Sequence, residues 1–188
     1  IKKNLNCINY IKTPNNCLPL FNGATLNELT TFEKYLEDSK IDKKNKNFGG
    51  LFKIKHKNHF IIIDIDKPPQ KKFSKSYQSG PLSFEYYLDG TKIITNSGFG
   101  NHISKQTELL SRLTACQSTL TINDTSITKF EKNEMINKVF GNSIQNSFSS
   151  FDFLSKNEDN LVGCSVSNNG YEKKFGCIHK REIYVDKT

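Results

Sequence analysis

The pattern of apolar and polar positions predicts one helix near the start of the chain. Thr25 and Glu28 have the spacing of a capping box, in which a hydroxyl and a carboxylate satisfy free backbone amides at a helix start. Apolar side chains then recur three or four positions apart as far as Leu36, which is the period of an α-helix. We expect this helix to end near residues 38–40.

Beyond Gly50 the pattern changes to that of short strands separated by turn residues. Apolar and β-branched residues predict strands, together with one short helical turn at 106–113. The predicted strands are 51–55, 59–65, 82–88, 92–95, 118–122, 126–130, 144–151, 161–167 and 175–185. Asp89-Gly90 and 168–170 have the composition of hairpin turns. The pattern therefore predicts an all-β fold, an antiparallel β-sandwich with one short N-terminal helix.

Length and composition fit one domain with, at most, a small attachment. The chain has 188 residues, of which 35% are hydrophobic and 24% charged, values that argue against a disordered protein. No apolar run approaches the ~20 residues of a membrane-spanning helix. The chain begins at Ile1 and ends within a strand-like run, so we interpret it as a fragment of a longer protein. Residues 1–17 are predicted to be an extension of a missing upstream region.

The formal net charge of +8 suits a polyanionic partner, which could be nucleic acid or a uronate-bearing polysaccharide. The lysines are scattered through loops, however, so a solvated basic surface explains them equally well. The sequence has no recognisable nucleic-acid motif, and we expect no nucleic-acid partner.

The five cysteines are widely and irregularly spaced, which argues against a zinc knuckle and against a dense disulfide framework. Buried free thiols are the expectation, although one disulfide remains open. His56 and His59 form an H-x-x-H pair without a third ligand, and we interpret both as surface residues.

Four segments in a fixed order resemble the heparinase II/III-like family. Gly80–Glu85 is similar to the family's H-A-x-x-L-S-F-E strand, and Lys92–Gly98 to its return strand ending in D-S-G. Arg112–Leu120 resembles R-x-T-x-A-H-S-T-L, and Asn169–Arg181 resembles the end of H-D-G-Y followed by G-x-x-H-R-R. The likeness defines a domain over 18–188, truncated at its C-terminus.

The resemblance implies one part of a two-part polysaccharide lyase. Family members have an α/α-toroid followed by an antiparallel, supersandwich-like β-sandwich, and the cleft between them binds an acidic polysaccharide. Cleavage is a β-elimination, in which a tyrosine and a histidine of the toroid transfer protons. Nothing in this chain resembles the toroid, so the isolated chain is expected to be inactive. The family places the protein in the periplasm or cell envelope.

The resemblance also implies histidines and an aspartate that can hold a structural metal, and this chain has neutral amides in their place. The first-strand histidine falls on Gln78, the aspartate on Asn96, and two further histidines on Gln117 and Asn168. Amides are poor zinc ligands and do not act as general bases near neutral pH. We therefore expect no metal and no other cofactor. Gln78, Asn96 and Gln117 could instead bind a sugar, or form a buried amide cluster.

Four further residues are candidates for the site. Arg112 could bind a uronate carboxylate in a bidentate manner, or form a structural salt bridge. His179 is the weak candidate for a catalytic residue, with a satisfied core histidine as the alternative. Tyr77 and Tyr171 could stack on sugar rings or close the core.

Three functional hypotheses follow from the sequence. The first is a lyase module that needs the missing toroid for activity. The second is a noncatalytic module that binds acidic polysaccharide, and the third, which we favour least, is nucleic-acid binding. Formation of unsaturated uronate ends by the whole protein separates the first hypothesis from the second.

Overall fold

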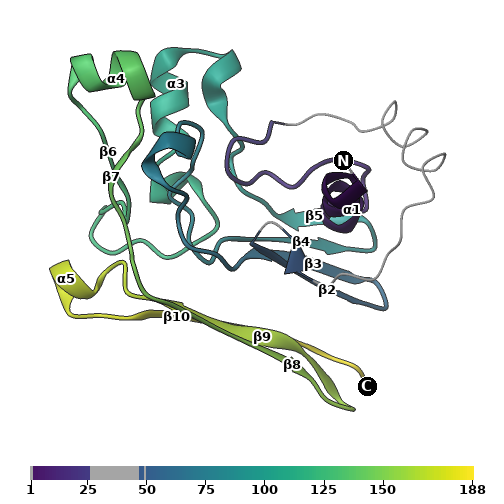
Figure 1. Cartoon of the computed structure of the whole chain (residues 1–188). Coiled ribbons are helices and arrows are strands. Elements are labelled where there is room, and N and C mark those ends of the chain that lie inside the picture. The colour runs from purple at the N-terminus through teal and green to yellow at the C-terminus, as the bar shows by residue number, and fades with distance from the viewer. Residues whose placement is uncertain (1, 26–46, 49) are drawn as a thin grey trace.

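The computed structural model describes residues 2–25, 47–48 and 50–188 (Figure 1). Its paired strands are antiparallel and form sheets of order β1-β2-β3-β4-β5, β10-β9-β8 and β6-β7. The first sheet consists of β1 Asn47–Phe48, β2 Leu51–His56, β3 His59–Asp64, β4 Phe84–Leu88 and β5 Thr91–Ile94. The other strands are β6 Lys129–Phe130, β7 Ile144–Asn146, β8 Phe151–Asn157, β9 Leu161–Asn168 and β10 His179–Asp186.

Short helices connect or precede the strands. They are α1 Lys2–Ile11, η1 Lys71–Phe73, η2 Gly100–His102, α3 Lys105–Leu110, η3 Thr114–Cys116, α4 Glu134–Phe140 and α5 Glu172–Phe175. Within the described ranges, no helix is long and apolar enough to cross a membrane.

The strand β3 is buried on both faces, which explains its uninterrupted apolar sequence. Successive side chains of a strand point to opposite faces of the sheet. Ile61 belongs to a core cluster that reaches Val166 of β9, whereas Ile62 belongs to a cluster that includes Phe21. The five-stranded sheet therefore lies between the β8–β10 sheet and the N-terminal segment.

The face-to-face packing of two antiparallel sheets confirms the predicted all-β sandwich. The sheet of β8, β9 and β10 lies against one face of β2 and β3 (Figure 1). Phe52 of β2 meets Phe153 of β8 edge-on, with ring centroids 5.2 Å apart. This shared apolar layer is the main core of the domain.

Residues from the predicted extension contact the opposite face of the sheet. The Lys53 ammonium donates to the Tyr10 carbonyl at 2.6 Å, and the Lys53 amide donates to the Tyr10 hydroxyl at 3.2 Å. Ile11 at the end of α1 packs against the cluster around Phe21. The boundary between 17 and 18 stays a prediction. The predicted helix falls on 26–40, outside the described residues.

The strand predictions were accurate around the central hairpins and inaccurate in the second half. The observed β2, β3, β4, β5 and β9 confirm five predictions, and α3 confirms the helical turn. No strand forms over 118–122, where Ile122 makes only an isolated bridge to Thr125. The run 144–151 is divided between β7 and β8, and α5 delays the final strand to His179.

All five cysteines lie among the described residues and are free. Cys17 and Cys164 are buried as predicted, but Cys177 is exposed. The expectation of buried thiols therefore holds for only part of the set.

Candidate functional site

Two of the candidate amides meet at one backbone carbonyl. The Gln78 side chain, 1% exposed, donates to the carbonyls of Gly98 and Ser111, each at 2.9 Å. The Gln117 side chain donates to the same Ser111 carbonyl at 2.7 Å. These contacts join the loop before β4 to the segments that follow β5 and α3.

Asn96 completes what we call the amide cluster, Gln78, Asn96 and Gln117. Its side-chain oxygen accepts from the Ser118 amide at 2.9 Å and from the Ser118 hydroxyl at 3.0 Å. Its side-chain nitrogen is buried without a hydrogen-bond partner in the described part of the chain. The Gln78 oxygen accepts from Gly23 at 3.1 Å, so two of the three amide oxygens are already engaged.

Arg112 lies beside the amide cluster and is fully buried. Its guanidinium donates to the carbonyls of Tyr77 at 2.8 Å, Asn142 at 2.5 Å and Ser74 at 2.9 Å. It also lies 3.9 Å from the centre of the Phe130 ring. Burial lowers the Arg112 pKa to about 10, so the group remains charged at neutral pH. This geometry favours a structural role for Arg112. The partners of the guanidinium are backbone carbonyls and not the carboxylate of the salt bridge considered from the sequence.

Tyr77 lines a cavity of about 260 Å³ next to the amide cluster. The tyrosine ring is 4% exposed, and its hydroxyl is hydrogen-bonded to the Thr128 side chain. Burial and the nearby Asp64 carboxyl raise the Tyr77 pKa above its usual range. Tyr77 is therefore a neutral part of the cavity wall.

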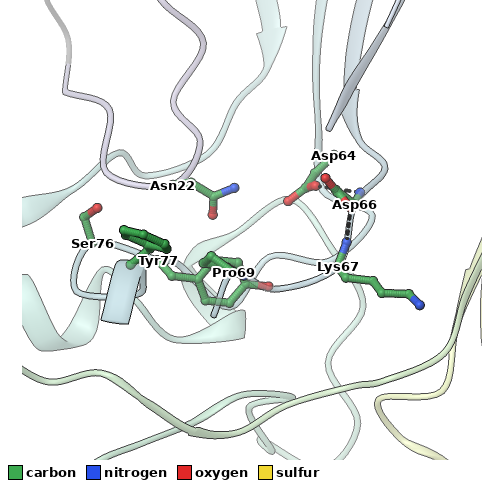
Figure 2. A pocket seen from close by; sticks show the side chains of 8 residues that line it. Asn22, Asp64, Asp66, Lys67, Pro69, Ser76 and Tyr77 are labelled. Atoms are coloured by element: carbon green, nitrogen blue, oxygen red, sulfur yellow. Dashed lines mark hydrogen bonds between the residues drawn. The ribbon is translucent and has the colours of Figure 1, made fainter. Parts of the chain in front are cut away.

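Two segments form this cavity, the turn at Asn22 and the run from Asp64 to Tyr77. Figure 2 shows Asn22 on one side, Asp64 at the end of β3 with the nearby Asp66 on another, and Pro69 and Tyr77 below them. The turn at Asn22 needs the glycine that follows it. Gly23 has a φ of +99°, and a Cβ there would lie 2.7 Å from the Cβ of Ser76. The same Gly23 amide binds Gln78, so the cavity and the amide cluster share one turn.

Asp64 is the buried carboxyl of the cavity. Burial raises the pKa of its carboxyl to about 7, although hydrogen bonds from the Asp66 amide and the Asn22 side chain oppose the rise. The Asp66 amide lies 3.2 Å from the carboxyl oxygen. Such a perturbed acid in a cavity is a typical feature of functional sites. The sequence reasoning missed Asp64, for which the only signal was an acid ending a buried strand.

His179 and Tyr171 lie apart from the amide cluster, at the start of β10 and in the connection between β9 and β10. The two rings are 6.5 Å apart, and the Tyr171 hydroxyl donates to the carbonyls of Leu120 and Thr125. Among the described residues, neither His179 Nδ1 nor the side-chain nitrogen of its strand partner Asn168 has a hydrogen-bond partner. Burial, reinforced by Arg181, lowers the His179 pKa to about 4.

Glu85 ends the L-S-F-E segment and is fully buried. Its carboxylate accepts from the Leu20 amide at 3.1 Å, the Thr95 hydroxyl at 2.9 Å and the Tyr87 hydroxyl at 3.0 Å. The glutamate thus attaches the N-terminal segment to β4 and the end of β5. Sequence reasoning did not assign it a role.

The comparisons with known proteins agree with this arrangement. A profile of the family described as "Heparinase II/III-like, C-terminal" matches residues 42–188. The chain belongs to this family. No curated protein matches the chain in sequence.

Solved structures of heparinases have the same fold. A heparinase III gene product superposes with a TM-score of 0.68 at 17% identity, over 95% of this chain and 29% of the other. The heparan sulfate lyase HepC from Pedobacter heparinus superposes with a TM-score of 0.62 at 16% identity, over 95% and 29% of the two chains. The present chain therefore spans less than a third of the length of these enzymes.

The residues of the amide cluster do not fit the metal that the family resemblance implies. Gln78, Asn96 and Gln117 offer only neutral amide oxygens, which bind Zn²⁺ poorly. The oxygens of Gln78 and Asn96 already accept backbone hydrogen bonds. Elsewhere in the described ranges, no group of three or more His, Cys, Asp or Glu residues is placed to hold a metal ion.

Proposed function

We propose that this chain is the β-sandwich part of a polysaccharide lyase that cleaves uronic-acid-containing polysaccharide by β-elimination. The observation that carries the proposal is the family match over residues 42–188. The superposition on heparinases over 95% of the chain supports it. The enzyme further requires an α/α-toroid from the same polypeptide, and it acts in the periplasm or cell envelope.

The chemistry of β-elimination assigns different tasks to the two parts. A base removes the proton next to the uronate carboxylate, and an acid protonates the departing glycosidic oxygen. The amide cluster supplies neither group, because amides do not titrate near neutral pH. His179 is 4% exposed and its pKa lies near 4, so it is poorly suited to both steps. We therefore assign proton transfer to the toroid and substrate positioning to the sandwich.

The positive charge of the sandwich supports a role in attracting its substrate. A net charge of +8 raises the local concentration of a polyanion and accelerates its association. We propose an acidic polysaccharide, and not a nucleic acid, as the partner of this surface.

We further propose that the amide cluster connects the surrounding loops through hydrogen bonds, without a metal ion. Gln78 and Gln117 hold the Ser111 carbonyl from two sides, and Asn96 holds Ser118. These hydrogen bonds join the loop before β4 to the segments that follow β5 and α3.

The proposed function is tested with the full-length protein that contains this chain and a panel of uronic-acid polysaccharides. β-Elimination creates an unsaturated uronate whose ultraviolet absorbance rises with time. We expect absorbance to rise on at least one member of the panel. A polysaccharide without uronate is the matched control, because it lacks the acidic proton. Absence of new absorbance on every uronate polysaccharide that the protein binds would overturn the proposal.

A noncatalytic polysaccharide-binding module is the second candidate. The replacement of titratable positions by amides with engaged oxygens favours it. Retardation of a polysaccharide in affinity electrophoresis, without new ultraviolet absorbance, would support this candidate over the first.

A further inference from the structure

The cavity beside the amide cluster has the lining of a binding site for a single small ring. Its volume of about 260 Å³ is slightly below the ~300 Å³ at which pockets for drug-sized ligands begin. Pro69 and Phe73 supply apolar surface, while Asn22, Ser76 and the two aspartates supply polar groups. A few convergent polar groups on an apolar lining are characteristic of ligand sites.

The polar groups are held in place before any ligand arrives. The Asp64 carboxyl is 5% exposed and is fixed by the Asp66 amide at 3.2 Å and by the Asn22 side chain. The neighbouring wall is the Tyr77 ring, which is immobilised by burial and by its bond to Thr128. A fixed acceptor beside an amide suits the hydroxyl groups of a sugar, each of which both donates and accepts.

Phe73 gives the cavity an exposed aromatic surface. The side chain is 69% exposed, although burial of an aromatic ring is strongly favourable. The C–H face of a pyranose is apolar and flat, so it can cover such a ring while its hydroxyls reach the aspartates. Figure 2 shows the polar groups of Asn22, Asp64 and Asp66 gathered on the side of the cavity opposite Pro69.

The charges of the cavity select against an anionic sugar. Asp64 and Asp66 contribute two carboxyls and Lys67 one ammonium, in a protein that is otherwise basic. A uronate or sulfate group placed here would lie close to like charges, which repel strongly at a partly buried site. The ring that fits is therefore one without a negative charge.

We propose that this cavity binds one uncharged pyranose ring of the polysaccharide chain, through hydroxyl contacts to Asp64 and Asn22 and ring stacking on Phe73. The inference rests on the proposed function, because it identifies the sugar next to a uronate as the ring bound here.

The protonation of Asp64 gives the site a pH signature. The pKa of Asp64 is raised to about 7 by burial, and the other charged or titratable groups lining the cavity are Asp66, Lys67 and Tyr77. Below pH 7 the Asp64 carboxyl becomes neutral, so discrimination against an anionic ring should weaken. An uncharged ring should bind with little change, because a carboxylic acid still hydrogen-bonds hydroxyls.

The test uses the full-length protein and a pair of sugars that differ only at C6, glucose and glucuronate, with binding followed by ligand-observed NMR. We expect glucose to bind at least about tenfold more tightly than glucuronate at pH 8, with a smaller ratio at pH 5.5. Phe73→Ala and Asp64→Ala, which removes the hydrogen-bonding group altogether, should each weaken glucose binding about fivefold or more. Asp66→Asn should strengthen glucuronate binding, and the exposed Asp152→Asn is the matched control. Thermal unfolding verifies that each variant is folded.

Equal binding of the two sugars, or unchanged glucose binding by the folded Phe73→Ala variant, would overturn the inference. Lyase activity whose KM is unaffected by Phe73→Ala and Asp64→Ala would also overturn it, while the proposed function stands. A third result is possible: the protein has no lyase activity, but it binds glucose and the variants weaken that binding. In that case the cavity is a sugar site and the proposed function is wrong.

Discussion

Replacement of the buried Arg112 by methionine should destabilise the protein severely. The substitution keeps most of the aliphatic volume but removes the donors for three carbonyls, those of Tyr77, Asn142 and Ser74. Each buried acceptor left unpaired costs about 1–3 kcal/mol. Partial hydration of these carbonyls reduces the sum, so we expect the free energy of unfolding to fall by about 3–5 kcal/mol.

Urea denaturation measures this loss directly. With an m-value of about 2 kcal/mol/M, the unfolding midpoint of Arg112→Met should fall by roughly 1.5–2.5 M. Lys129→Met is the matched control, because Lys129 is a neighbouring, exposed cation in β6. We expect that variant to change by less than about 0.5 kcal/mol.

The result also separates the two interpretations of Arg112. A change of less than about 1 kcal/mol in Arg112→Met, accompanied by a raised KM for polysaccharide in the full-length enzyme, would refute the structural role. The Arg112 guanidinium would then bind a substrate carboxylate, after a local rearrangement that releases it from the backbone carbonyls. A large loss of stability, with a native-like KM for the Arg112→Met protein that remains folded, would agree with a structural role for the hydrogen bonds from Arg112 to the three carbonyls.

Three other predictions concern buried polar groups. Glu85→Ala removes the acceptor of the Leu20 amide and should cost about 3 kcal/mol, with faster hydrogen exchange at Leu20. Asp64 has a folded-state pKa of about 7, above the unfolded value of ~3.9. The contribution of Asp64 to the free energy of unfolding is therefore fully present below about pH 4 and is lost as the pH rises to 7. Asp64→Asn should abolish this loss, which urea titrations at several pH values measure. Metal binding should appear in a variant that restores the titratable groups, with a melting temperature raised by Zn²⁺ and lowered by chelator, whereas the native protein responds to neither. Its substitutions are Gln78→His, Asn96→Asp and Gln117→His.

The central hairpins could be predicted from sequence because local signals and tertiary packing agree there. The continuous apolar run of β3 is buried on both faces, and Asp89 adopts a φ of +49° in the turn that Asp89-Gly90 predicted. The second half lacks this agreement. Residues 118–122 have a β-like sequence but form no strand. The Ser118 amide donates to the Asn96 side chain and not to a neighbouring strand. A side-chain hydrogen bond of this kind has no signature in the local period.

The candidate site was predicted in part, for a related reason. The resemblance to the family motifs predicted that Gln78, Asn96 and Gln117 belong to one site. In the structure their side chains form hydrogen bonds that connect neighbouring loops. Whether they bind substrate stays a prediction. Asp64 was missed because its raised pKa arises from burial within the fold, which the residues next to it in the sequence do not reveal. No pattern local to β3 distinguishes such an acid from an ordinary strand-ending aspartate.

The order of the charges across the site limits how the proposed enzyme could work. The amide cluster is neutral, Arg112 directs its donors to backbone carbonyls, and the adjoining cavity is lined by two aspartates and by Lys67. Lys67 is thus the cation that these groups offer to a uronate carboxylate, and the two aspartates offset its charge. Elimination requires the negative charge of the uronate to be stabilised as the proton leaves, so we expect most of that stabilisation to come from residues outside this cluster and cavity. An uncharged ring seated on Phe73 would place the adjacent uronate beyond the aspartates, where the other part of the enzyme can supply it.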